Sequence, residues 1–392
     1  MKVLKIQRLL LYLFFFSLNF EMLDLSGSDF FSIGKLAGIL YFLSLIPSIP
    51  LFLNSKSVKL EMGLLWLFFF LMTVNNLINI NHVSGGFFDF TMFQNIVLLF
   101  LIVNHERRDP GILEKAFLFF AIGSVVLLIF TLLGVAVEID SDGRLSIFGE
   151  NENAVGIRMV ISSVILVLTT LQNRIKLGKW RFLFLVPIPF MIGLMASTGS
   201  RVSVISLFLC FVVGVVIVRG GGPFRKFAIF LSAVLIGVYL FNYLLDSEVI
   251  YNRLMQASEQ GDLAGRDIIW GKVVQLIEAN PIIGVGQTGY ADFMNREHGT
   301  ITSPHNVILE VLAYTGIIGL FIFLFFIGKL IYVAYLYYKR TGQLLQFLLF
   351  IPIMGLILSG QLLATKLAYV IFALALSRKF YIKKKHENSL FH

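Results

Sequence analysis

Long apolar runs alternate with short polar segments along the whole chain. The apolar runs predict membrane spans at roughly 9–25, 32–53, 60–80, 87–103, 112–137, 154–172, 182–198, 201–218, 224–245, 306–338, 343–360 and 362–377. Each run is about 20 residues long, which is enough for a helix to cross a bilayer. Because the runs are continuous rather than alternating, they predict helices and not the strands of a barrel. The sequence therefore predicts an all-α, polytopic integral membrane protein with about twelve transmembrane helices.

The composition agrees with this interpretation. The chain has 392 residues, of which 57% are hydrophobic and 14% are charged, whereas a soluble domain is nearer 45–50% apolar and about 25% charged. We expect a single membrane domain over residues 1–392. The last two runs are separated only by SGQLLATK (359–366) and could form one long span or two. Cys210 is the one cysteine, so an intrachain disulfide is excluded.

Basic residues mark every second loop of the predicted topology. They lie in or next to segments 2–8, 56–59, 107–108, 174–181, 219–226, 339–340 and 378–385. With twelve spans these segments all fall on one side, which the positive-inside rule assigns to the cytoplasm. Both termini are then cytoplasmic. The formal charge of +9 is explained by this topology and gives no reason to expect nucleic acid as a partner.

One large loop, residues 246–304, is predicted to lie outside the membrane. Within it, the apolar positions of GRDIIWGKVVQLIEA follow helical spacing, and Asn280-Pro281 should end the helix. This pattern predicts a short amphipathic helix that lies on the membrane surface or caps a cavity. Trp270 fits an interfacial position in that helix.

Two short motifs have weak functional readings. GVGQTG (284–289) has the G-x-G-x-x-G spacing of dinucleotide folds, but a helix and a proline turn precede it where such a fold needs a strand. We interpret it as a turn. Asp140-Ser-Asp142 could bind a divalent cation together with a diphosphate. It lies on the predicted outer side, where nucleotide sugars are absent, so we interpret it as a solvated turn and expect no metal site.

Several polar residues stand at or within apolar runs, where charge is costly without a partner or a cavity. Arg201 begins a span on the predicted outer side, against the positive-inside trend, which favours a functional role. Arg158 and Lys115 are expected nearer the membrane interior, each in a structural ion pair. At the start of the span at 306, Ser303 is a plausible N-cap with Pro304 following it. That interpretation does not require the histidine that follows, His305.

The chain resembles the bacterial O-antigen ligase and O-antigen polymerase superfamily. The resemblance is carried by TGSRVS (198–203), GRDIIW (265–270), NPIIGVGQTGY (280–290), and SPHN (303–306) with the following ILEVLAYTGIIGL. A weaker resemblance is found at GRLSIFGENENAVG (143–156), because the family often has an Arg and a Gly/Asn-rich stretch before a span. The similarity is strongest over about 143–320. Each motif alone is weak, and their order is specific for the superfamily but not for one branch.

The resemblance implies a multi-span glycosyltransferase on the outer face of the bacterial cytoplasmic membrane. Its donor would be an oligosaccharide linked to a polyprenyl diphosphate, and its acceptor a glycan or a lipid. Ligases transfer the glycan to the lipid A core, whereas polymerases transfer it to another lipid-linked repeat unit. The resemblance implies no metal or other cofactor.

The resemblance also implies site residues. Arg201 and Arg266 match the arginines assigned to the diphosphate, and His305 matches the family histidine at the loop-to-span junction. The chemistry is suitable, because a guanidinium binds phosphate oxygens bidentately and keeps its charge. An imidazole can accept a proton from a hydroxyl or hydrogen-bond a phosphate, and the two roles stay open. Substrate-binding roles are expected for Asn306, Arg144, Asn153 and Trp270.

Three alternatives to a polymerase remain: a ligase, a transporter or flippase, and a noncatalytic assembly partner. Intact glycan synthesis after Arg266→Ala and His305→Ala would favour the assembly partner. A ligase is not distinguished by the sequence, although no feature specific for a lipid A core acceptor favours the polymerase. A transporter or flippase of lipid-linked glycan should show repeats, broken helices and charges in the membrane interior. Arg158 and Lys115 fit that alternative, whereas the absence of an obvious repeat and the clustering of Arg and His around the large loop count against it.

Overall fold

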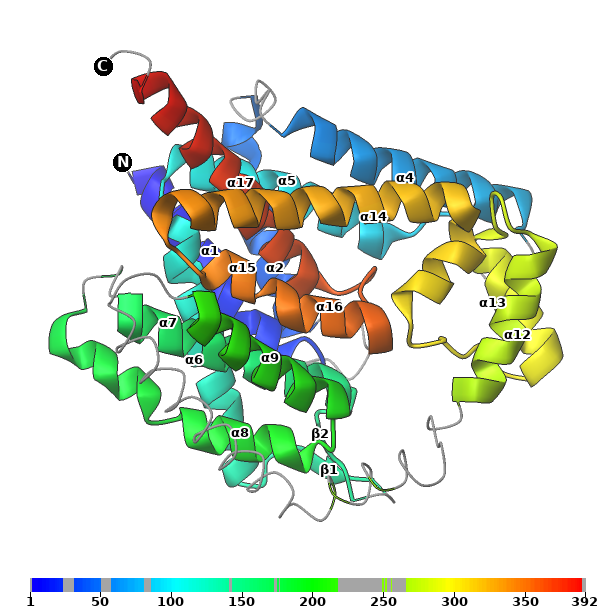
Figure 1. The fold of residues 1–392 in the computed structure, drawn as a ribbon, viewed down its shortest axis with the longest axis horizontal. Helices are drawn as coiled ribbons and strands as arrows, with labels where there is room; N and C mark the ends of the chain where they lie inside the picture. The colour runs from blue at the N-terminus through cyan, green and yellow to red at the C-terminus, as the bar shows by residue number, and fades with distance from the viewer. Residues whose placement is uncertain are drawn as a thin grey trace. The chain divides into compact units, whose positions relative to one another are not determined.

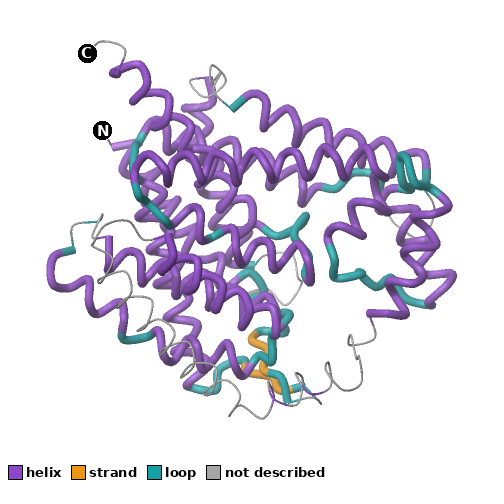
Figure 2. Tube along the Cα trace, in the orientation of Figure 1, coloured by secondary structure: helices purple, strands orange, loops and turns teal. Residues whose placement is uncertain are grey.

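The part of the chain that the computed structural model describes is mostly helical (Figures 1 and 2). The structure describes residues 2–23, 32–50, 58–80, 86–140, 143–172, 175, 177–217, 249, 251, 255 and 266–389. The expectation of helices is confirmed for these residues. One element was not expected, a two-stranded antiparallel sheet of β1 (Val137–Ile139) and β2 (Leu145–Ile147), in which Glu138 pairs with Ser146.

The chain forms two compact units, which we describe separately. The first unit comprises residues 1–53, 105–260 and 338–352, and the second comprises 54–104, 261–337 and 353–392. The helices of the first unit are α1 (Lys2–Ser17), α2 (Ile33–Leu45), α6 (Ile112–Leu132), α7 (Glu152–Gln172), α8 (Ile188–Ser197), α9 (Arg201–Ile217) and the short α15 (Leu345–Leu348), with 3-10 segments η1 (Leu18–Phe20), η2 (Ile46–Ser48) and η3 (Gly178–Leu185).

Polar side chains join the central helices of the first unit. Asn19, at the end of α1, donates from Nδ2 to the carbonyl of Phe120 at 2.9 Å and accepts from the hydroxyl of Ser124. Gly123 allows this approach, because a Cβ there would come within 2.6 Å of the Asn19 Nδ2. Ser124 also hydrogen-bonds Ser162 of α7 at 2.6 Å. Buried polar groups of this kind stabilise only one arrangement, since each is paired only when α1, α6 and α7 are in register.

The second unit contains α4 (Lys59–Ile78), α12 (Arg266–Ala279), α13 (Gly286–His298), α17 (Lys366–Ser389) and most of α5 (Phe90–Arg108), α14 (Val307–Thr341) and α16 (Phe350–Ser359). The prediction that Asn280-Pro281 ends a helix is confirmed, since α12 stops at Ala279. The last two apolar runs are two helices, because α16 and α17 are separate at 360–365.

Helix α14 is broken at Gly316, which has φ 60° and ψ −163°. The segment after α12 pairs with this break: Val285 N donates to the Ala313 carbonyl at 2.8 Å, and Ile317 N donates to the Pro281 carbonyl at 2.9 Å. A side chain at Gly316 would collide with the Ile282 carbonyl, so glycine is needed both for its φ and for this contact. From Ile317 to Thr341 the helix is about 37 Å long at about 1.5 Å per residue, enough to cross the bilayer alone.

Asn75 of α4 holds the same break from another side. Its Nδ2 donates to the carbonyls of Ile283 and of Tyr314, the latter at 3.0 Å. The neighbouring Asn76 accepts from the Gln287 and Thr288 amides at 2.6 and 3.3 Å, which caps the start of α13. Two adjacent asparagines in an apolar helix therefore satisfy backbone groups at the break in α14 and at the start of α13.

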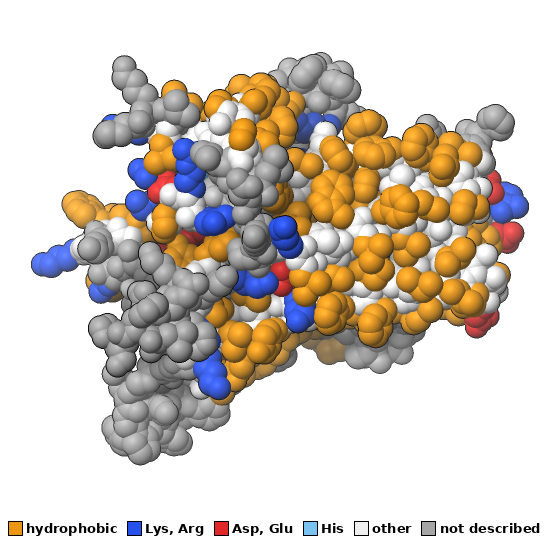
Figure 3. Space-filling view, turned by 90° about the horizontal axis from the view of Figure 1, so that it is seen from above, with side chains coloured by type: hydrophobic (Ala, Val, Ile, Leu, Met, Phe, Trp, Pro, Cys, Tyr) orange, Lys and Arg blue, Asp and Glu red, His pale blue; other side chains and the backbone are white. Residues whose placement is uncertain are grey.

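Five helical segments of the described residues are long and apolar enough to cross a membrane: 59–78, 112–132, 152–172, 178–197 and 307–341. Three shorter apolar segments are 33–48, 201–217 and 345–359. Figure 3 shows hydrophobic side chains over much of one described face, and Phe70 of α4 and Phe321 of α14 are among the exposed apolar side chains. These features support a membrane protein. Twelve spans stay a prediction, and the span expected at 224–245 lies outside the described residues.

Candidate functional site

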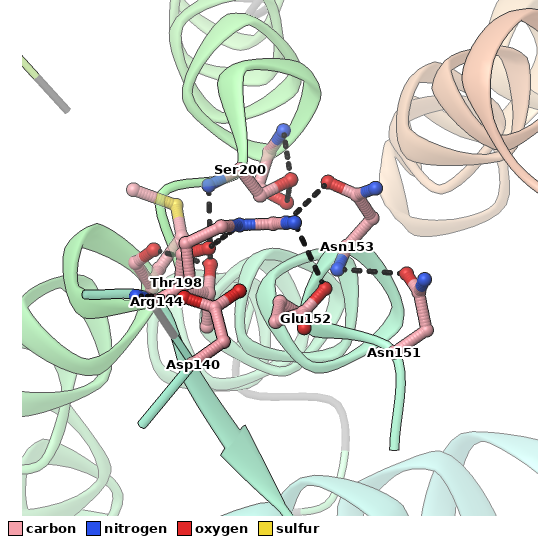
Figure 4. Close-up of polar contacts among 9 residues, drawn as sticks. Asp140, Arg144, Asn151, Glu152, Asn153, Thr198 and Ser200 are labelled. Carbon is pink, nitrogen blue, oxygen red and sulfur yellow. Dashed lines mark hydrogen bonds and ion pairs between the residues drawn. The ribbon is translucent and has the colours of Figure 1, made fainter. Parts of the chain in front are cut away.

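Arg144 is the centre of a polar cluster in the first unit (Figure 4). It follows the turn between β1 and β2, and its guanidinium makes an ion pair with Glu152 at 3.0 Å. The same group donates to the carbonyl of Thr198 at 3.1 Å and to Asn153 Oδ1 at 3.4 Å. The Arg144 amide donates to Asp140 Oδ1 at 2.8 Å. Arg144 thus connects the β-hairpin to the start of α7 and to the turn between α8 and α9.

That turn is the TGSRVS segment, and it leads directly into α9 at Arg201. The hydroxyl of Thr198 donates to the Met195 carbonyl at 2.7 Å, and the hydroxyls of Ser203 and Ser200 are 2.8 Å apart. Thr198, Ser200 and Ser203 are all fully buried. The predicted break between the two apolar runs is confirmed at 198–200, and Arg201 is a half-buried residue at the first position of the helix.

Arg158 forms a buried ion pair with Glu150, as the sequence predicted for a structural role. Its two terminal nitrogens contact both carboxylate oxygens of Glu150, one at 2.6 Å. Burial raises the pKa of Glu150, and Arg158 opposes that rise. A structural ion pair nearer the membrane interior was also predicted for Lys115, and the structure differs from that prediction. Lys115 is exposed in the first turn of α6, because the helix begins only three residues earlier, at Ile112.

In the second unit, α12 and α13 hold the loop that precedes α14. The indole N–H of Trp270 donates to the Pro304 carbonyl at 2.8 Å, and the hydroxyl of Tyr290 donates to the Thr302 carbonyl at 2.7 Å. Burial raises the pKa of Tyr290, which keeps the phenol protonated as a donor. The prediction of a helix after residue 265 is confirmed by α12. Within α12, Val273 is buried and Ile268 is exposed. Arg266 is the first residue of α12.

The SPHN segment forms a tight turn before α14. Asn306, and not Ser303, caps the helix, because Asn306 Oδ1 accepts from the amides of Ile308 and Leu309 at 3.0 and 3.2 Å. The cap prediction for Ser303 was wrong because His305 has φ 48°, which ends any helical path from Pro304. Ser303 accepts instead from the His305 amide at 3.1 Å and donates to Glu310 Oε1 at 2.6 Å.

The predicted site residues thus belong to two groups. Arg144 and Asn153 are in contact, in the unit that also contains Arg201. The other unit contains Arg266, Trp270, His305 and Asn306. In that unit, Trp270 hydrogen-bonds the turn that contains His305 and Asn306. Over the described ranges, three or more His, Cys, Asp or Glu side chains are nowhere grouped as a metal site would require. Of the D-x-D pair, Asp142 lies outside those ranges.

Sequence reasoning missed several residues of these clusters. Glu152 lies beside the predicted Asn153, and Glu310 follows His305 by five positions. Both glutamates could therefore have been selected as neighbours of the motifs. Asn75 and Asn76 had a direct signal, because adjacent amides inside an apolar run must find partners in the membrane. Thr198 acts through its backbone carbonyl, for which the sequence gives no signal.

A comparison of the sequence with models of known protein families finds a match that includes members of both groups of site residues. A family model described as O-antigen ligase matches residues 186–324. This stretch is similar to the O-antigen ligase family. The match confirms the resemblance to the O-antigen ligase and polymerase superfamily, whose members are glycan-transferring enzymes. No curated protein matches the chain. The matched stretch begins just before α8 and ends within α14. It includes Arg201, Arg266, Trp270, His305 and Asn306, whereas Arg144 and Asn153 precede it.

Proposed function

We propose that the protein transfers or polymerises glycan repeat units carried on a polyprenyl diphosphate, at the outer face of the bacterial cytoplasmic membrane. The observation that supports this proposal is that the stretch matching the O-antigen ligase family contains two arginines at helix starts and a histidine turn before a long apolar helix. Those groups suit a lipid-borne diphosphate, because the ligand is anionic and lies at headgroup level.

In this proposal Arg201 and Arg266 bind the diphosphate of the donor. Each is the first residue of its helix, where the positive end of the helix dipole also favours an anion. The leaving diphosphate gains negative charge as the glycosidic bond breaks, so fixed positive charge stabilises the transition state more than the ground state. Two guanidinium groups can supply this stabilisation, and the reaction needs no metal ion.

His305 acts on the acceptor hydroxyl or hydrogen-bonds the diphosphate. As a base, its imidazole would remove the hydroxyl proton while the acceptor oxygen attacks the anomeric carbon and the diphosphate leaves. Direct attack from the face opposite the diphosphate inverts the anomeric centre. Retained configuration in the product linkages would exclude that single displacement.

Polymerase is favoured over ligase, since the sequence contains no feature specific for a lipid A core acceptor. The deciding experiment is deletion of the gene in its host, followed by size profiles of the surface polysaccharide and of the polyprenyl carrier pool. Single repeat units on the final acceptor, without long chains, indicate a polymerase. Long chains retained on the carrier, with a bare acceptor, indicate a ligase.

A lipid-linked glycan flippase is the alternative from another class. The broken helix α14 is a feature that transporters also have. The described residues weaken this alternative in two respects, because Arg158 is paired with Glu150 and Lys115 is exposed. Carrier-linked repeat units that accumulate on the cytoplasmic face of the deletion strain would favour the flippase and reject transfer.

A further inference from the structure

Glu310 is a buried carboxyl in the first turn of α14 that the proposed reaction does not use. Its exposure is 5%. The helix start does not need it as a cap, because Asn306 already accepts from the amides of Ile308 and Leu309. A buried carboxylate is costly unless it accepts hydrogen bonds. Glu310 accepts one from the hydroxyl of Ser303 at 2.6 Å, across seven residues of sequence.

That hydrogen bond fixes the direction of the Ser303 hydroxyl. Because the Ser303 proton points to Glu310, the lone pairs of Oγ are available to accept from the His305 amide at 3.1 Å. A hydroxyl that donates to a carboxylate is also a stronger acceptor, since hydrogen bonds in a chain polarise one another. The three residues therefore form a line from a buried carboxyl to the backbone of the histidine.

The backbone that this line holds is strained. His305 has φ 48°, in the left-handed region that side chains with a Cβ rarely adopt. Such a conformation persists only where surrounding contacts over-determine it. Here the Ser303 hydroxyl holds the His305 amide, and Trp270 holds the preceding Pro304 carbonyl at 2.8 Å. The direction of the imidazole depends on this conformation, since φ sets where the Cβ points.

We propose that Glu310 is a positioning residue which, through Ser303, keeps His305 in its left-handed conformation and so directs the imidazole toward the reacting groups. This inference rests on the proposed function, in which His305 takes part in glycan transfer. Glu310 need not contact the donor or exchange a proton with it. Its carboxyl serves as an acceptor whose position is fixed by α14.

The test uses the full chain, purified in detergent and added to membranes of the deletion strain, which supply the host's own lipid-linked glycan and acceptor. Turnover and the apparent KM for the glycan are measured for Ser303→Ala, Glu310→Ala and Glu310→Gln. Glu297→Ala removes an exposed carboxyl from the same unit and is the matched control. Size-exclusion profiles identify any variant that fails to fold.

Leaving a buried polar group without its hydrogen-bond partner should lower turnover about 10- to 100-fold in Ser303→Ala and Glu310→Ala, with little change in KM. Glu310→Gln keeps an oxygen that accepts from Ser303, so it should retain turnover within about fivefold of the parent. In a His305→Ala background, Glu310→Ala should cause no further loss, because both changes act on one group.

Three results would overturn these expectations, and each points to a different error. Full turnover of Glu310→Ala, beside an inactive His305→Ala, rejects the positioning role and leaves the proposed function intact. Full turnover of His305→Ala rejects the role of the histidine itself. Folded Glu310→Gln that is as inactive as Glu310→Ala shows that the negative charge acts directly. Because Gln and Ser303→Ala preserve the size of the core, they test the idea even if Glu310→Ala does not fold.

Discussion

Gly156 of α7 lies against the hydroxyl of Ser203 in α9, so that a Cβ on the glycine would come within 2.5 Å of the Ser203 Oγ. The same Cβ would come within 2.9 Å of the Thr198 Oγ1. The last glycine of GENENAVG therefore gives the TGSRVS turn the space in which it presents Arg201. Two segments that each resembled the superfamily are parts of one packed structure.

We predict that Gly156→Ala will destabilise the first unit and lower activity. The added methyl forces the α8–α9 turn away from α7, and overpacking of this kind costs about 1–3 kcal/mol. Thermal unfolding of the purified protein in detergent measures the effect. Gly63→Ala in α4 is the control, since its Cβ would meet no atom within 4 Å. A Gly156→Ala protein as stable as that control would contradict the packing argument.

The buried ion pair between Arg158 and Glu150 should show a characteristic pattern of mutational effects. Removing one partner leaves an uncompensated buried charge, so Arg158→Met alone should cost about 3–5 kcal/mol. Replacing both, with Arg158→Met and Glu150→Leu, should restore most of the stability, because neither charge then remains buried. The yield of folded protein and its unfolding midpoint report the difference. If the double variant folds but is inactive, the Arg158–Glu150 pair has a role in the reaction in addition to its structural role.

The break in α14 should depend on Asn75. Asn75→Ala removes the donor shared by the Ile283 and Tyr314 carbonyls, and a buried acceptor without a partner costs about 1–3 kcal/mol. The matched change Asn295→Ala lies on the exposed face of α13 and should have no effect. Hydrogen exchange followed by mass spectrometry should detect faster exchange in 281–290 and 313–320 for Asn75→Ala. Unchanged exchange there would mean that the backbone pairing alone holds the break.

The polar turn at Asp140 should be dispensable for catalysis. Asp140 accepts from the Arg144 amide within the hairpin turn, and this exposed contact contributes little. Asp140→Ala combined with Asp142→Ala is therefore expected to retain activity within about threefold of the parent. The comparison is made with and without added Mg²⁺ or Mn²⁺. Activity that is lost in the double variant and recovered with metal would reinstate a cation site.

Several local features could be predicted because they depend on nearby residues. The break at TGS and the end of α12 at Asn280-Pro281 follow from residues that stop helices where they stand. The hairpin was missed because its strands contain three residues each and adjoin a long apolar run. The break at Gly316 was missed for a different reason. The hydrogen bond between Ile317 and Pro281 at the break connects segments far apart in the sequence, and the apolar run at 306–338 continues on both sides of Gly316.

The candidate site was predictable to a similar extent. The motifs indicated Arg201, Arg266 and His305 as residue types suited to a diphosphate, but they could not assign the supporting contacts. The cap of α14 illustrates the limit, since Ser-Pro is a common helix start and only the left-handed backbone of His305 transfers the cap to Asn306. Contacts made through a carbonyl, such as that of Thr198 with Arg144, have no sequence signal.

The diphosphate role of the two arginines makes a sharp prediction for charge-conserving substitutions. Lysine keeps the positive charge but has one nitrogen in place of a planar fork, so it cannot bind two phosphate oxygens in the same geometry. Arg266→Lys and Arg201→Lys should each lower turnover about 10-fold or more, since charge-assisted hydrogen bonds contribute about 1.5–3 kcal/mol. Arg296→Lys is the matched control, because Arg296 is exposed on α13 and pairs with Asp292 at 3.0 Å. Its activity should equal that of the parent. If Arg266→Lys is also fully active, charge alone is sufficient at that position, and the bidentate clamp on the diphosphate is rejected.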